Sequence, residues 1–117
     1  MLRLTAQYAD LWNASYMGKP SSFEPYRSKV LEACRAVGRD PATLGTTALI
    51  ALANPDLGEP FPLGVEPLSG SDEEIVEAMH GYALLGTAHL MFHLTPYMPE
   101  AVDRLVRAMN LYRSNYP

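Results

Sequence analysis

The chain has 117 residues with a single cysteine, carries a formal net charge of −4 at pH 7, and is 48% hydrophobic. This length suits one modest domain, and one cysteine excludes both an internal disulfide and a cysteine metal cluster. The acidic balance argues against a nucleic-acid partner, no apolar run reaches membrane-helix length, and without a secretory signal the expected location is the cytoplasm.

The first third of the chain predicts two helices separated by a short strand. Residues 2–8 have apolar side chains at helical spacing, and residues 10–13 suit a very short strand. A loop is expected over residues 14–21 because it contains a glycine and a proline. Residues 22–37 then predict a helix, with Ser22 as its N-cap and a glycine stop after it.

A buried strand and a long loop follow. Residues 46–53, TTALIALA, are a continuous apolar run, which is typical of a parallel strand buried on both faces. Residues 54–70 are rich in proline and glycine, and connections of this length are uncommon in compact domains. The loop is therefore either a lid that closes over a substrate, with Phe61 and Leu63 as apolar contacts, or a plain surface connection.

The clearest local signal is a capped helix that leads into a strand. Ser71 and Glu74 match the Ser-x-x-Glu capping box, in which each side chain covers a free backbone donor. The helix is expected to end at Gly86, followed by a short buried strand over residues 87–92 and a last helix over residues 98–112. This alternation predicts a parallel α/β arrangement with too few strands to close a barrel, which takes about 250 residues.

Four local sequences together resemble the luciferase-like monooxygenase superfamily, in its flavin- and deazaflavin-dependent branches. They are LRLTAQYADLWN (2–13), GRDPATLG (38–45), GSDEEIVEAMHGYALLGTAHLMF (70–92) and PEAVDRLVRAMNLYR (99–113). The resemblance implies a partial (β/α)₈ TIM barrel, of which residues 1–117 are a single incomplete domain that corresponds to the C-terminal third.

The resemblance also implies a cofactor and a substrate. In this family FMN or a deazaflavin coenzyme lies across the carboxyl mouth of the barrel and reacts with a small-molecule substrate. The glycine-rich turn that holds the cofactor phosphate would lie upstream of Met1. The resemblance therefore carries over no catalytic or cofactor-binding residue, and whether this chain binds the cofactor by itself stays open.

Three residues are substrate-side candidates: His93, Trp12 and Asn13. His89 and His93 share one face of a regular strand, which in a barrel points inward, with His93 at the carboxyl end where active sites form. His93 is then either a general acid/base or a partly exposed histidine at a strand end. Trp12 and Asn13 would lie near the mouth and contact a ring, or Trp12 fills a gap between helices. The histidines lack metal-ligand spacing, so no metal site is expected.

Three functions are compatible with these observations. The first is the C-terminal part of a luciferase-like flavin- or deazaflavin-dependent oxidoreductase or monooxygenase. The second is a non-catalytic, truncated α/β fragment whose activity is self-association, and the third is a small ligand-binding α/β domain that merely resembles the family. A strand without a partner exposes backbone donors and acceptors, so a homo-oligomer is expected in each case.

Overall fold

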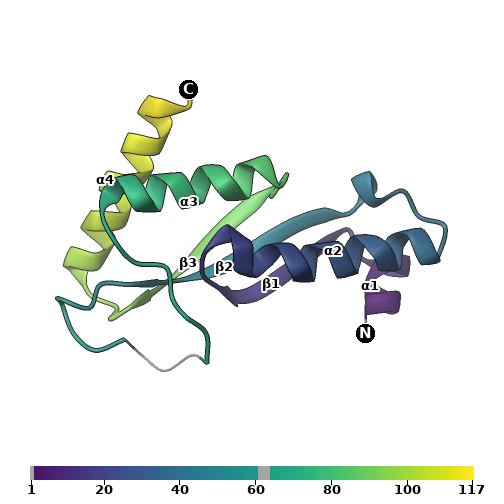
Figure 1. The fold of residues 1–117 in the computed structure, drawn as a ribbon, viewed down its shortest axis with the longest axis horizontal. Coiled ribbons are helices and arrows are strands. Elements are labelled where there is room, and N and C mark those ends of the chain that lie inside the picture. Colours follow the sequence, from purple (N-terminus) through teal and green to yellow (C-terminus); the bar gives the residue numbers. More distant parts are fainter. Residues whose placement is uncertain (1, 61–63) are drawn as a thin grey trace.

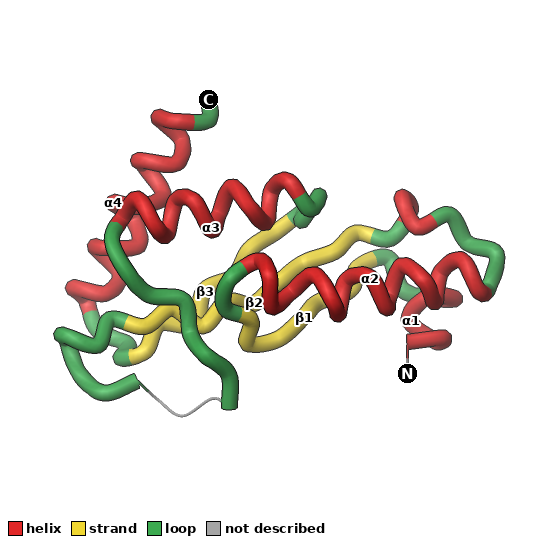
Figure 2. Tube along the Cα trace, viewed as in Figure 1, coloured by secondary structure: helices red, strands yellow, loops and turns green. Residues whose placement is uncertain are grey.

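The computed structural model describes residues 2–60 and 64–117, and these residues form an open three-stranded parallel sheet with four α-helices (Figures 1 and 2). In chain order the elements are α1 (Leu2–Tyr8), β1 (Leu11–Met17), α2 (Pro20–Ala36), the 3₁₀ turn η1 (Pro41–Thr43), β2 (Gly45–Ala53), α3 (Asp72–Leu84), β3 (His89–Thr95) and α4 (Pro99–Asn115). The predicted parallel α/β class is confirmed, and the described residues do not close into a barrel.

The strand order is β1-β2-β3, and both strand pairs are parallel. Figure 1 shows α2 and α3, the two helices that connect successive strands, on the same side of the sheet. We call this side the covered face. Its alternate strand residues pack against the helices in one apolar cluster that includes Ala14, Met17, Ala48, Ile50, Leu52, Phe92, Leu94, Phe23, Ile75, Met79 and Tyr82.

Tyr82 connects the last turn of α3 to the turn that follows β1. Its side chain is fully buried and its Oη donates a hydrogen bond of 2.6 Å to the Gly18 carbonyl oxygen. Burial raises the pKa of Tyr82 to about 12, because the phenolate would lose its hydration. The phenol therefore stays protonated and keeps its donor available for Gly18.

β1 is longer than the sequence predicted. A strand is present where residues 10–13 predicted one, but its predicted end is wrong, because β1 continues to Met17. The predicted loop at residues 14–21 is therefore wrong as well, since only residues 18 and 19 lie between β1 and α2. A bulge interrupts the sequence pattern of this strand. Its pairing with β2 shifts between Ala14 and Met17, and Tyr16, within the bulge, has a φ of 56°. The inserted residue puts Ala14 and Met17 on the same face at a spacing of three, which breaks the alternation by which strands are recognised.

α2 also begins earlier than predicted. Pro20 is its first residue and Lys19 its N-cap, so the assignment of Ser22 as the N-cap is wrong. Proline is well tolerated at the first helical position, where a backbone N–H would have no intrahelical acceptor. Ser22 lies inside the first turn, where its Oγ donates to the Lys19 carbonyl at 2.7 Å and accepts from the Gly18 N–H at 3.2 Å.

The Ser71 half of the predicted capping box of α3 is confirmed, whereas β3 is displaced from its predicted range. Ser71 is the N-cap, and its Oγ accepts from the Glu74 N–H at 3.2 Å. β3 begins two residues later than expected, because the Thr87 N–H still donates to the Tyr82 carbonyl at the end of α3. The last predicted helix is present as α4 and extends three residues further, to Asn115.

Arg39 holds α1 against the rest of the fold. Its Nη1 donates to the carbonyl oxygens of Ala6 and Ala9, at 3.0 and 2.6 Å, and its Nε donates to Thr43 Oγ1 at 2.9 Å. Below these polar contacts lies a second, smaller apolar cluster whose buried members are Ala6, Val30, Cys34 and Leu44. The lone cysteine is therefore a fully buried packing residue.

Candidate functional site

The opposite side of the sheet, which we call the open face, is bare of helices among the described residues. Its side chains alternate with those of the covered face, and strand pairing places them in rows across the sheet. The rows are Asn13–Thr47–His89, Leu49–Met91 and Ala51–His93. In the first row, Thr47 Oγ1 donates to Asn13 Oδ1 at 2.9 Å.

The three strands contain no Asp, Glu, Lys or Arg. The open face therefore combines aliphatic, aromatic and imidazole groups with the amide of Asn13 and the hydroxyl of Thr47. It carries no formal charge when its histidines are neutral. Met91 and Tyr16 retain 37% and 36% exposure on it. A surface of this kind suits an apolar or aromatic partner and offers no charge to an ionic one.

Tyr16 and His93 meet across the open face, near the carboxyl ends of the strands. Their ring centroids are 5.7 Å apart at an interplanar angle of 85°, an edge-to-face contact. The two rings come from the outer strands β1 and β3, so the contact crosses β2, where Ala51 pairs with His93 and is fully buried. The bulge in β1 turns Tyr16 toward this contact.

A pocket of about 610 Å³ lies beside this ring pair, and we call it the mouth pocket. Its lining includes Tyr16, His93 and Tyr97, together with Glu59 from the long loop. Tyr97 is 83% exposed, so its ring is free to cover a bound molecule. The pocket combines aromatic surfaces for stacking with an imidazole that can donate or accept a proton.

Trp12 and Asn13 do not belong to the mouth pocket. They are the second and third residues of β1, at the opposite end of the strand from the mouth. Trp12 points to the covered face, where its ring stacks on Phe23 with centroids 5.8 Å apart. Asn13 lies on the open face but contacts Thr47 and not His93. Their expected position at the mouth depended on a four-residue strand, and β1 continues beyond them.

Sequence reasoning found His93 and missed its neighbours. Tyr16 fell within a predicted loop, and Tyr97 and Glu59 carried no motif. The signal that would have found Tyr16 is the pair of apolar residues, Ala14 and Met17, on either side of it, which becomes a strand pattern once one inserted residue is allowed.

The long loop between β2 and α3 is fixed at both ends. At its carboxyl end, Leu68 forms an isolated parallel bridge with Leu52 of β2. The Leu68 N–H donates to the Ala51 carbonyl at 2.7 Å, and the Leu68 carbonyl accepts from the Ala53 N–H at 2.8 Å. A Cβ on Gly18 would lie 2.4 Å from the Glu66 carbonyl oxygen, so only glycine allows this close approach. The predicted substrate contacts Phe61 and Leu63 lie outside the described residues.

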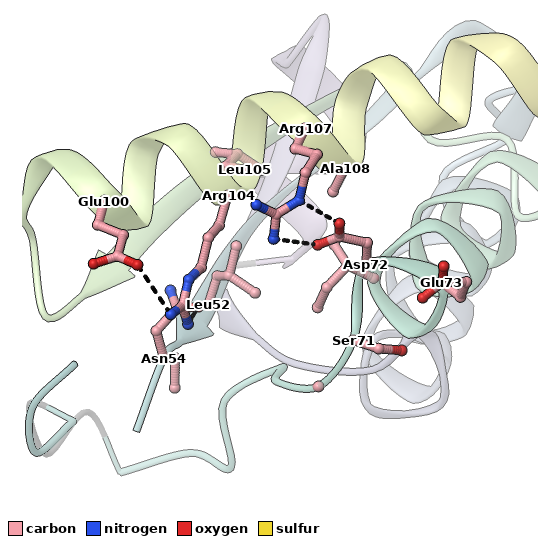
Figure 3. Close-up of a pocket in the computed structure, with 13 residues that line it drawn as sticks. Leu52, Asn54, Ser71, Asp72, Glu73, Glu100, Arg104, Leu105, Arg107 and Ala108 are labelled. Carbon is pink, nitrogen blue, oxygen red and sulfur yellow. Dashed lines mark hydrogen bonds and ion pairs between the residues drawn. The ribbon is translucent and has the colours of Figure 1, made fainter. Parts of the chain in front are cut away.

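A second pocket, of about 450 Å³, lies on the helix side between the end of β2, the start of α3 and α4 (Figure 3). Arg104 of α4 reaches across it to Asp56, with nitrogen–oxygen distances of 2.8 and 2.7 Å, and also contacts Asn54 and Glu100, both at 3.3 Å. Arg107 pairs in the same way with Asp72 at the start of α3.

These ion pairs connect α4 to the long loop and to the start of α3 at the second pocket. Hydrogen bonds from Arg104 and Arg107 hold the pKa values of Asp56 and Asp72, respectively, below their usual range. Because each arginine is already neutralised by a carboxylate, the pocket offers an incoming anion little net attraction. Arg104 instead fastens the first residues of the long loop to α4.

Among residues 2–60 and 64–117, no group of three or more His, Cys, Asp or Glu side chains is placed to hold a metal ion. No helix in this part of the chain is long and apolar enough to cross a membrane. No family model and no curated protein matches the chain.

Proposed function

We propose that this chain contributes the C-terminal units of a luciferase-like (β/α)₈ barrel and holds a flavin or deazaflavin ring at the mouth pocket. The observation that carries the proposal is the position of this pocket: it lies at the carboxyl end of β3, beside the ring pair that Tyr16 and His93 form on the helix-free face of a parallel sheet. In (β/α)₈ barrels the helices cover only the outer face, and active sites form at the carboxyl ends of the strands.

The lining of the mouth pocket suits the ring of such a cofactor and not its phosphate. Its volume is within the range of about 300–1,000 Å³ that small-molecule sites occupy. The aromatic side chains of Tyr16 and Tyr97 offer stacking surfaces, whereas the charged residue in the lining is an acid, Glu59. A phosphate would be repelled there, so a cofactor would be bound here through its ring.

The side chains of the pocket have distinct roles in this proposal. A bound flavin or deazaflavin supplies the hydride or oxygen chemistry. His93 donates or accepts the proton that accompanies the reaction at the substrate, and the edge-to-face contact with Tyr16 fixes the plane of the imidazole. The uncharged strands beneath exclude water from the ring.

A fluorescence titration tests the proposal. The purified chain is titrated with FMN, riboflavin and a deazaflavin, and both cofactor emission and the emission of Trp12, the single tryptophan, are followed. We expect saturable micromolar binding, with riboflavin within about threefold of FMN because the phosphate is not held. His93→Gln should weaken binding at least about fivefold, and the control His80→Gln, on α3, should leave it unchanged.

Two results would contradict the proposal. One is the absence of saturable binding for all three ligands, and the other is an equal effect of His93→Gln and His80→Gln. Either would favour the second candidate, a non-catalytic α/β chain that self-associates. The observation favouring that candidate is the uncharged open face, which needs no cofactor to be useful as a contact surface.

A further inference from the structure

The mouth pocket carries a negative charge at Glu59. Among the described residues that line the pocket, no lysine or arginine accompanies it. The three strands below contribute no further charge, since their sequences lack Asp, Glu, Lys and Arg. A ligand in the mouth pocket therefore meets a carboxylate that no basic side chain of the lining neutralises.

The first half of the long loop holds Glu59 beside the segment that follows β3. The Asn54 N–H donates to the Thr95 carbonyl oxygen at 3.1 Å, at the point where the loop leaves β2. One residue before Glu59, a Cβ on Gly58 would lie 3.4 Å from Pro96 Cγ, so the loop backbone is in van der Waals contact with the proline ring. These contacts fix the backbone from which the Glu59 side chain reaches the pocket.

The carboxylate of Glu59 differs from two other acids close by. Asp56 and Glu100 both pair with Arg104, at nitrogen–oxygen distances of 2.7 and 3.3 Å. Within residues 2–60 and 64–117, Glu59 forms no ion pair. Its charge is therefore available to a ligand, whereas the charges of Asp56 and Glu100 are already used inside the fold.

The aromatic part of the lining also suits a positively charged ligand. Tyr16 and Tyr97 contribute rings to the pocket, and Tyr97 retains 83% exposure. The face of an aromatic ring is electron-rich and attracts a cation, and sites for quaternary ammonium groups are built from such rings. A carboxylate beside exposed tyrosine rings therefore offers an organic cation two attractions that an anion lacks.

We infer that the mouth pocket selects a substrate that is an organic ammonium ion, with its charged nitrogen against the Glu59 carboxylate and the Tyr97 ring. Both residues belong to loops at the rim of the pocket, so the ring pair of Tyr16 and His93 on the strands stays available to the cofactor. In calling the cation a substrate, the inference rests on the proposed function, whereas recognition of the cation depends on the pocket alone.

Three small ligands that share a phenyl ring and differ in charge test the inference. The purified, ¹⁵N-labelled chain is titrated with benzylammonium, benzyl alcohol and benzoate, and the backbone N–H signals of Glu59 and Tyr97 are followed by NMR. We expect the cation to bind at least about fivefold more tightly than the alcohol, and the anion more weakly than the alcohol. Added salt should weaken binding of the cation and leave that of the alcohol unchanged, because exposed charges are screened.

Two glutamine substitutions separate the counter-ion from the overall charge. Glu66 is an exposed acid on the same loop, outside the lining of the pocket, so Glu59→Gln and Glu66→Gln remove the same charge. Glu59→Gln should weaken benzylammonium binding by about fivefold and leave benzyl alcohol binding unchanged, whereas Glu66→Gln should affect neither. Tyr97→Leu should weaken binding of the cation by about threefold, and Tyr97→Phe, which keeps the ring, should retain it.

Equal affinities for the cation and the alcohol would overturn the inference, as would equal effects of the two glutamine substitutions. The substituted side chains are exposed, so the variants should fold, which circular dichroism would check. A chain that binds flavin and does not prefer the cation would overturn the inference while the proposed function stands. A chain that prefers the cation and binds no flavin would support the cation site while the proposed function fails, so the two ideas can be separated.

Discussion

The covered face and the open face of the sheet are formed by alternate residues of the same strands, and their surroundings differ sharply. On the covered face Ile50 is fully buried among apolar side chains from α2 and α3. On the open face its neighbour Leu49 is partly exposed and lies beside Met91, which retains 37% exposure. The first face stabilises the chain, and the second is available for binding. Because successive side chains of a β-strand point to opposite faces, one strand can both stabilise the fold and offer a binding surface.

Adjacent residues of β2 give the largest expected contrast between the faces. Ile50→Ala should lower the free energy of unfolding by about 2–5 kcal/mol, because it leaves a cavity in the packed cluster. Leu49→Ala removes a side chain of equal size from the open face and should lower it by about 1 kcal/mol. Urea denaturation at low protein concentration, where association does not contribute, measures both. Equal losses would show that the two faces are packed alike.

A hydrogen bond on the covered side gives an intermediate effect with a pH signature. Tyr82→Phe leaves the buried Gly18 carbonyl without its donor and should lower the free energy of unfolding by about 1–2 kcal/mol. The pKa of Tyr82 is raised to about 12 in the fold, above its ordinary value of 10.0. The unaltered chain should therefore lose stability as the pH rises from 10 to 12, because only the unfolded phenol ionises readily.

The phenylalanine variant lacks this part of the alkaline decline. Urea denaturation of both proteins at several pH values isolates the contribution, since every other titrating group is common to the two. Tyr8→Phe, at a residue with 79% exposure, is the control and should behave as the unaltered chain. A variant that declines as steeply as the unaltered chain would show that Tyr82 is not the group responsible.

The smallest expected effect on stability, and of opposite sign, is at Tyr16 on the open face. Its φ of 56° is unfavourable for any residue with a Cβ, so Tyr16→Gly should raise the free energy of unfolding by up to about 1 kcal/mol. The same change removes the ring that contacts His93 and should weaken flavin binding. Ser15→Gly, next to it, should instead destabilise by about 0.5–1 kcal/mol. Thermal melting would decide, and a clear loss of stability in Tyr16→Gly would show that the positive φ of Tyr16 does not destabilise the fold.

The parts of the fold that could be predicted are those whose signals are local. The cap at Ser71, the apolar run of β2 and the helix in residues 98–112 each follow from a few neighbouring residues, and all three are present. The course of β1 could not be predicted in the same way. Its bulge depends on pairing with β2, about 35 residues later, and the sequence of β1 alone contains no sign of that partner.

The same reasoning applies to the candidate site. His93 was found because it follows His89 on one face of a short segment. Tyr16 and Glu59 come from two distant parts of the chain and lie near His93 only after β1 and β3 are placed on either side of β2. Tyr97 follows His93 by four residues, but no motif distinguished it. Of the two alternatives for Trp12, the structure agrees with packing against a helix and not with a position at the mouth, and its direction depends on Phe23 across the covered face.

Arg39 has a consequence for the order in which the chain folds. α1 has seven residues, too few to remain helical in isolation. The guanidinium that donates to the carbonyl oxygens of Ala6 and Ala9 belongs to Arg39, which follows them in the chain by 33 and 30 positions. That donor takes its place only when α2 has formed and the chain has turned back through Gly38. The amino-terminal helix, synthesised before its neighbours, is therefore among the last of them to become structured.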